Sequence, residues 1–171
     1  PSRDLSMERP IMDQLLKQDA LLFYPYESID PFLRLLKEAA RDPDVTSIRI
    51  TVYRLARNSK IIRHLVEAAD NGKDVTELME LRARFDEQNN IEYAELLENS
   101  GCNVLYGIEN YKVHSKLCLI TRSVGNEVQY FTQIGTGNYN EKTSAQYTDY
   151  SYMTARKSIG QDAVNFFQNM A

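Results

Sequence analysis

The sequence predicts an α/β protein in which a mixed β-sheet is flanked by helices on both faces. In the first two-thirds of the chain, runs rich in β-branched residues alternate with segments of helical periodicity, which is typical of strands joined by helices. Two later strands are separated by Gly125-Asn126, a turn dipeptide that indicates an antiparallel hairpin. The chain has 171 residues, enough to bury one core, and contains neither a tandem repeat nor a low-complexity linker.

The predicted elements of the first half are bounded by residues that start or stop regular structure. Asp30-Pro31 is typical of an N-cap followed by a first-turn proline. Asn71-Gly72 is typical of a helix end. In chain order these elements are a short helix at 10–18, a strand at 21–24, a helix at 32–41, a strand at 45–54 and a helix at 59–69.

The second half shows the same two periodicities, alternating for strands and near 3.6 residues for helices. Gly101 closes one of the predicted helices, and a charged loop that contains Arg84 and Asp86 precedes it. The elements are a strand at 75–82, a helix at 90–99, a strand at 104–107, hairpin strands at 116–121 and 128–134, a strand at 147–153 and a helix at 159–170.

Composition and charge narrow the classes of function. The net charge of −4 argues against a general nucleic-acid binder, whose affinity depends on many lysines and arginines. We find no apolar run of the roughly 20 residues that span a bilayer, and no signal segment. Cys102 and Cys118 form no metal-spaced pair, so a reducing cytoplasm is the simplest compartment. Because the first residue is Pro1, we expect an excised fragment of a longer protein.

A strand-like run with His114 and Lys116 near its start carries the main chemical signal. Alternate side chains of a strand share a face, so the imidazole and the ammonium would point the same way. A glycine-rich loop follows, in which Gly135 and Gly137 would let backbone N–H groups approach a ligand and Asn138 would add a side-chain donor. An imidazole nucleophile, a cation and backbone donors together predict a phosphoryl-transfer site. Alone, the histidine would more often be structural, and the loop would equally often be an ordinary turn between strands.

Histidine suits this chemistry because its usual pKa, about 6.5, leaves one ring nitrogen with a free lone pair near neutral pH. The other ring nitrogen needs an acceptor, and both Asp149 and Asp86 are candidates. Lys116 would offset the charge of the transferred phosphoryl group. We assign no role to His64, which lies among apolar residues of a predicted helix.

Three arginines lie at the ends of successive predicted strands, Arg54 at one and Arg82 and Arg84 at the next, where an α/β sheet binds its ligands. Arg54 and Arg84 are therefore placed to bind a polyphosphate tail through their guanidinium forks. Surface ion pairing is the alternative interpretation. Tyr147 could stack on a nucleotide base, although it is one of 11 tyrosines.

Several segments resemble bacterial polyphosphate kinase of the first family, from about residue 20 to the end and at family spacing. They are residues 25–31, 51–54, 83–91, 113–120, 135–143 and 147–150. The matching segment is the first of two catalytic C-terminal domains, each related in fold to phospholipase D. The resemblance thus implies a lead-in from a preceding domain at 1–20 and the catalytic domain at 21–171.

The resemblance implies reversible transfer of the terminal phosphate of ATP to polyphosphate through a phosphohistidine. His114 matches the nucleophile, Tyr147 matches an ATP-contacting tyrosine, and Arg54 and Arg84 match positions associated with magnesium. Arginine has no lone pair to give a metal, so we expect both to bind the phosphates that carry the ion. The implied partners are ATP, ADP, polyphosphate and the remaining domains of a full-length homo-oligomer, without nucleic acid. The implied location is the cytoplasm, with peripheral membrane association of the full-length enzyme as a further possibility.

The sequence departs from related families at two positions. Phospholipase D enzymes carry an aspartate where this chain has Thr121, which argues against a diesterase or nuclease half-site, the main alternative. Gln133 stands where relatives often have another histidine, and its role is open. A third hypothesis is a non-enzymatic module that binds polyphosphate. With the second catalytic domain missing, we expect the isolated segment to contain the nucleophile and to be inactive.

Overall fold

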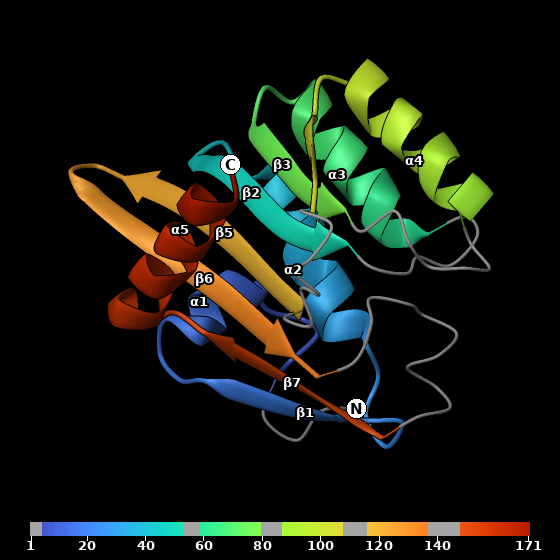
Figure 1. Ribbon diagram of the computed structural model, residues 1–171. Coiled ribbons are helices and arrows are strands. Elements are labelled where there is room, and N and C mark those ends of the chain that lie inside the picture. Colours follow the sequence, from blue (N-terminus) through green and yellow to red (C-terminus); the bar gives the residue numbers. More distant parts are fainter. Residues whose placement is uncertain (1–4, 53–58, 80–86, 108–115, 137–147) are drawn as a thin grey trace.

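The computed structural model describes residues 5–52, 59–79, 87–107, 116–136 and 148–171. They form a seven-stranded mixed sheet with the order β1-β7-β6-β5-β2-β3-β4 (Figure 1). The strands are β1 Ala20–Tyr24, β2 Val45–Val52, β3 Asp74–Met79, β4 Asn103–Tyr106, β5 Lys116–Val124, β6 Glu127–Gly135 and β7 Asp149–Thr154. Strands β2, β3 and β4 pair in parallel, and every other neighbouring pair is antiparallel.

These directions decide which strand ends meet. The carboxyl ends of β1, β2, β3, β4 and β6 and the amino ends of β5 and β7 all lie at one edge of the sheet. We call this edge the site edge. It is where an α/β sheet with parallel strands commonly binds its ligands.

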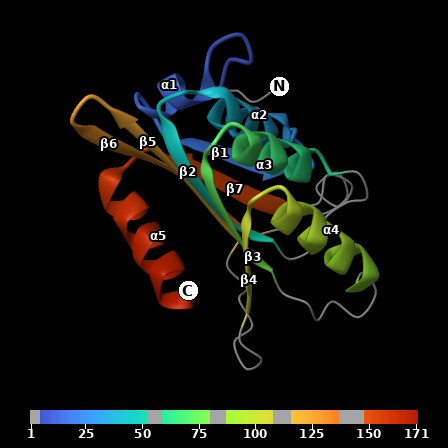
Figure 2. The same cartoon turned by 90° about the horizontal axis from the view of Figure 1, so that it is seen from above.

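Helices cover both faces of the sheet, as predicted (Figure 2). Helices α1, α2, α3 and α4 lie on one face, and α5 lies on the other. Their bounds are α1 Ile11–Leu15, α2 Asp30–Arg41, α3 Lys60–Asp70, α4 Glu87–Asn99 and α5 Lys157–Met170. None of the described helices is both long and apolar enough to cross a membrane.

Strand β5 contains a continuously apolar stretch, residues 117–120, because both faces of the strand are covered there. Cys118 and Ile120 belong to the large core beneath α1–α4, whereas Leu117 and Leu119 pack against α5. Helix α5 approaches the sheet closely at Gly160, where an added Cβ would lie 2.2 Å from the Cβ of Tyr130. A glycine is therefore required at this helical position.

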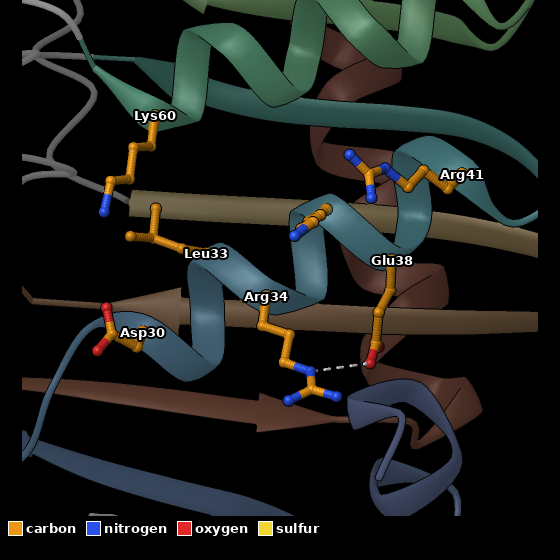
Figure 3. Close-up of a pocket in the computed structure, with 7 residues that line it drawn as sticks. Asp30, Leu33, Arg34, Glu38, Arg41 and Lys60 are labelled. Carbon is orange, nitrogen blue, oxygen red and sulfur yellow. Dashed lines mark ion pairs between the residues drawn. The ribbon is translucent and has the colours of Figure 1, made fainter. Parts of the chain in front are cut away.

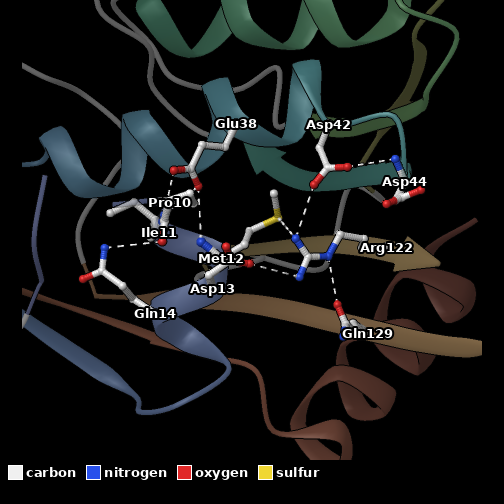
Figure 4. Close-up of polar contacts among 10 residues, drawn as sticks. All are labelled: Pro10, Ile11, Met12, Asp13, Gln14, Glu38, Asp42, Asp44, Arg122 and Gln129. Carbon is white, nitrogen blue, oxygen red and sulfur yellow. Dashed lines mark hydrogen bonds and ion pairs between the residues drawn. The ribbon is translucent and has the colours of Figure 1, made fainter. Parts of the chain in front are cut away.

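Polar contacts fasten α1 to α2 and to the hairpin (Figure 4). The Glu38 carboxylate accepts hydrogen bonds from the backbone N–H groups of Ile11, at 2.6 and 2.8 Å, and Met12, at 3.2 Å. These donors are the unpaired N–H groups at the start of α1. Burial nevertheless raises the pKa of Glu38, against the opposing effect of these N–H donors.

Most predicted elements are confirmed, with corrections at their ends. Asp30 is not the N-cap of α2: it lies in the helix, and Ile29 occupies the cap position without a side-chain cap. The carbonyl oxygen of Ile29 instead accepts from the N–H groups of Phe32 and Leu33. The other differences are a shorter first helix, earlier starts for α4 and α5, and longer hairpin strands on either side of the turn.

Candidate active site

Three predicted site residues lie together at the site edge. Lys116 is the first residue of β5, Gly135 is the last residue of β6, and Asp149 is the first residue of β7. In the register of these adjacent strands, Lys116 is opposite Gly135, which is in turn opposite Ser151. The structure therefore brings these positions together, and their chemical roles stay predictions.

Gly135 has close neighbours, and its backbone angle is not unusual. A Cβ added at this position would lie 3.0 Å from Gln133 Nε2, 3.4 Å from the carbonyl oxygen of Tyr150 and 3.8 Å from Lys116 Cβ. The first contact is tighter than most contacts of a Cβ, so a larger residue would require the Gln133 amide to shift by a few tenths of an ångström. Glycine thus lets the Lys116 side chain and the Gln133 amide share the space over one point of the sheet.

A threonine that the sequence analysis missed links the ends of β6 and β7. The Thr136 hydroxyl donates to Asp149 Oδ1 at 3.3 Å and accepts from the backbone N–H of Tyr150 at 2.9 Å. The Thr136 N–H also donates to the Tyr150 carbonyl oxygen at 3.1 Å. This clamp positions the Asp149 carboxylate at the site edge. The only sequence signal for it is a threonine directly after a strand-ending glycine.

A second missed threonine fixes the start of β5. Thr51, buried near the end of β2, accepts from the backbone N–H of Leu117 at 3.0 Å and donates to its carbonyl oxygen at 3.5 Å. The regular backbone register between these strands ends at Ile50 and Cys118. The Thr51 side chain therefore extends the pairing by one residue and holds the backbone next to Lys116.

Gln133 belongs to a buried polar chain beneath the site edge. Its Nε2 donates to Ser151 Oγ at 3.0 Å, and Ser151 also hydrogen-bonds the hydroxyl of Tyr24. Burial raises the pKa of Tyr24 to about 12, with a smaller contribution from the carboxylates of Glu27 and Asp149 and opposed by the Ser151 hydrogen bond. The phenol is thus a stable neutral partner. Gln133 acts here as a packing and hydrogen-bonding residue.

The remaining predicted positions lie outside the described residues. They are Arg54, Arg84, Asp86, His114, Gly137, Asn138 and Tyr147. Their described neighbours in sequence are informative: Val52 ends β2, Met79 ends β3, Lys116 begins β5 and Asp149 begins β7. All four neighbours lie at the site edge.

Magnesium needs oxygen ligands, chiefly carboxylates and phosphates. No group of three His, Cys, Asp or Glu side chains that could hold a metal ion occurs within the described parts of the chain. A single carboxylate such as Asp149 does not provide a magnesium-binding site. The described residues therefore do not fit a magnesium ion held by protein side chains alone.

The fold is shared with proteins of the phospholipase D class. A phospholipase D family member, Nuc from Salmonella typhimurium, superposes with a TM-score of 0.68 at 18% identity, covering 90% of this chain and 93% of that one. NucT from Helicobacter pylori gives a TM-score of 0.67 at 17% identity. These likenesses show the fold alone.

The family follows from the sequence. The family model for "Polyphosphate kinase C-terminal domain 1" matches residues 10–171, so the chain belongs to this family. The polyphosphate kinase of Halalkalibacterium halodurans is 48% identical over 171 residues, and that of Campylobacter jejuni subsp. jejuni is 45% identical over 157 residues. The crystal structure of polyphosphate kinase from Porphyromonas gingivalis superposes with a TM-score of 0.85 at 39% identity, covering 98% of this chain and 29% of that one.

These comparisons confirm the resemblance and the fold class predicted from the sequence. The chain spans about a quarter of the length of the curated relatives it matches, with 24% of the Halalkalibacterium enzyme covered.

Proposed function

We propose that this chain forms the phosphate-accepting part of a longer polyphosphate kinase. In this proposal, the enzyme transfers the terminal phosphate of ATP reversibly to polyphosphate through a phosphohistidine at His114. The family membership supports the kinase class. The observation that carries the site is the meeting of Lys116, Gly135 and Asp149 at one sheet edge.

Covalent geometry links His114 to this edge. It precedes Lys116 by two residues, so the two Cα atoms are at most about 7 Å apart. By the same reasoning, Arg54 is two residues from the end of β2 and Tyr147 is two residues from the start of β7. Short connections thus tie the proposed nucleophile, one proposed phosphate-binding arginine and the tyrosine proposed to contact the nucleotide base each to a strand end at the site edge.

The first proposed step forms a phosphoenzyme. The free lone pair of a His114 ring nitrogen attacks the γ-phosphorus of ATP, and a P–N bond forms as the bond to the β,γ-bridging oxygen breaks. ADP leaves with the electron pair. The proton on the other ring nitrogen is held by a carboxylate, for which Asp149 and Asp86 are the candidates.

The second proposed step transfers the phosphoryl group to the chain. A terminal oxygen of polyphosphate attacks the phosphorus, the P–N bond breaks, and its electron pair returns to the His114 nitrogen. The product is one phosphate longer. Lys116 offsets negative charge on the transferred group in both steps, and backbone N–H groups of the loop that includes Gly137, with the side chain of Asn138, contribute further donors.

Magnesium enters the proposal only as a companion of the substrate. The ion would be held by phosphate oxygens of ATP and would neutralise part of their charge. Arg54 and Arg84 would bind the same phosphates through their N–H groups, because a guanidinium cannot ligate a metal.

We also propose that this domain works only together with the other domains of the full-length enzyme. Further contacts to ATP are expected from other domains of the full-length enzyme, which we propose to be a cytoplasmic homo-oligomer. The isolated segment is then expected to be inactive.

Exchange of label between ADP and ATP tests the proposal. A phosphoenzyme returns its phosphoryl group to labelled ADP, so the full-length enzyme should make labelled ATP without polyphosphate. His114→Gln should slow this exchange by at least about a thousandfold, because the nucleophile is removed. The control is His64→Gln, the other histidine of this chain, which should leave exchange intact.

Two outcomes would contradict the proposal. One is exchange at the parental rate in His114→Gln. The other is hydrolysis of bis-p-nitrophenyl phosphate in the absence of ATP, which a phospholipase D-like diesterase would catalyse.

A further inference from the structure

A basic groove lies on the outer surface of α2 and extends to the start of α3 (Figure 3). Its volume is about 640 Å³. Four cations line it: Arg34, Lys37 and Arg41 from α2, and Lys60 from α3. On a chain with a net charge of −4, this concentration of positive charge is a local exception.

The helical spacing arranges these cations in a row. Arg34, Lys37 and Arg41 are three and four residues apart, so they lie along one face of α2 over about 10 Å. Lys60 is the first residue of α3 and approaches the groove from the neighbouring helix. A row of cations fits an extended anion better than a single compact one.

The acidic residues of the groove leave a positive excess. Asp30 and Glu38 are its two acids, against four cations. The Glu38 carboxylate is directed at the N–H groups that begin α1, where it accepts at 2.6 Å from Ile11. Its distance to Arg34 Nε is longer, at 3.6 Å.

The positive surface continues from α2 onto α3. His64, half-buried in α3, has its pKa lowered, first by burial and then by the positive charges of Lys37, Arg41 and Arg63, with Glu67 opposing. Cations from both helices therefore act on the same imidazole. Glu67 of α3 neutralises part of the charge of Arg41, with which it pairs at 2.6 Å.

The groove starts beside the site edge. Helix α2 follows the carboxyl end of β1, and α3 follows the carboxyl end of β2, so both helices begin at this edge and run away from it. Asp30 and Lys60 mark the near end of the groove, and Arg41 marks the far end.

We propose that this groove binds the inorganic polyphosphate chain and leads it away from the site edge. The inference rests on the proposed function and adds a binding surface for the chain outside the reaction centre. A linear chain with a charge on every repeat matches a row of cations, whereas single-stranded nucleic acid is usually also bound by stacking of its bases on aromatic rings. The described residues that line the groove include no aromatic side chain.

A matched pair of charge reversals in the full-length enzyme tests this inference. Lys37→Glu with Lys60→Glu reverses two groove cations, both exposed. Lys17→Glu with Lys157→Glu is the control: it makes the same change in net charge at two exposed lysines outside the groove, and Lys157, like Lys60, is the first residue of its helix. Binding of long-chain polyphosphate and of tripolyphosphate is measured for each protein over a range of salt concentrations.

We expect the groove variant to bind long-chain polyphosphate about tenfold more weakly. Its affinity should also depend less steeply on salt, with the magnitude of the slope of log affinity against log salt reduced by roughly two. Tripolyphosphate, too short to span the groove and the reaction centre, should be affected less. Equal long-chain binding by groove and control variants would overturn the inference. So would a loss of affinity for single-stranded DNA without a loss for polyphosphate. Exchange of label between ADP and ATP needs no chain, so its absence in the parental enzyme would instead refute the proposed function.

Discussion

Glu77 is a carboxylic acid placed where a charge is least stable. It lies in β3 with an exposed fraction of 0%, and among the described residues only the weak Cys102 thiol donor and the backbone of Glu77 itself interact with its carboxyl group. Burial raises the pKa of Glu77 to about 8, and the Cys102 thiol beside it opposes this rise only in part. Burial, together with the charge of Glu77, also raises the pKa of Cys102 to about 12. Both groups are therefore neutral at pH 7 in the folded protein.

The raised pKa of Glu77 predicts a pH-dependent loss of stability. The folded state keeps its proton up to about pH 8, whereas the unfolded chain loses it near the ordinary value of 4.5, so the free energy of unfolding falls between these values. Glu77→Gln cannot ionise, so its free energy of unfolding should not fall in this way. On going from pH 5 to pH 8, the stability of Glu77→Gln relative to the parent should rise by up to roughly 3 kcal/mol. Chemical denaturation at both pH values measures the difference.

Glu127→Gln, at an exposed glutamate of the hairpin, is the control and should follow the parent at both pH values. A Glu77→Gln protein that loses as much stability as the parent on going from pH 5 to pH 8 would show that Glu77 is ionised in the fold.

For the helices and strands, the local sequence predicts the type and the order of the elements better than it predicts the residues at which each element begins and ends. Gly72 and Gly101 have φ angles of 83° and 90°, so the predicted helix ends have the left-handed residue that such glycines provide. Asp30 was misassigned because an aspartate before proline fits both an N-cap and a first helical turn, and the neighbouring backbone decided between them. Thr51 and Thr136 could not be found, since their partners are distant in sequence.

The hairpin is connected to the rest of the fold by a buried arginine. Arg122, 8% exposed, donates from Nε to Gln129 Oε1 at 2.8 Å and from Nη1 to Asp42 Oδ2 at 3.3 Å. Its guanidinium carbon lies 4.9 Å from the centre of the Phe131 ring. One side chain thus joins β5, β6 and the end of α2.

Arg122→Met should lower the free energy of unfolding by about 2–4 kcal/mol, because it removes these contacts and leaves Asp42 without its buried partner. The control is Arg156→Met, whose exposed guanidinium is 3.2 Å from Asp19 and should cost less than about 1 kcal/mol. Denaturant titration of both proteins compares the two losses. Equal losses of free energy of unfolding would mean that the buried contacts of Arg122 stabilise the fold no more than the exposed ion pair of Arg156 does.

In the whole molecule, the strand order brings the residues of the candidate site together. Lys116, Gly135 and Asp149 are up to 33 residues apart in sequence, yet they begin or end three adjacent strands. The sequence predicted their chemistry from residue type and from the family resemblance. It could not predict the strand order, because long-range pairing is not encoded in local periodicity. The basic groove was missed for the same reason, since its cations come from two helices that pack together only in the fold.

The proposed mechanism requires a covalent phosphate on His114. The most direct measurement is to incubate the full-length enzyme with γ-labelled ATP, quench without acid, and map the acid-labile label by mass spectrometry. We expect label on the peptide that contains His114 and its complete transfer to polyphosphate when the chain is added. Label on another residue, or chain growth by an enzyme that never acquires label, would rule out a phosphohistidine at His114.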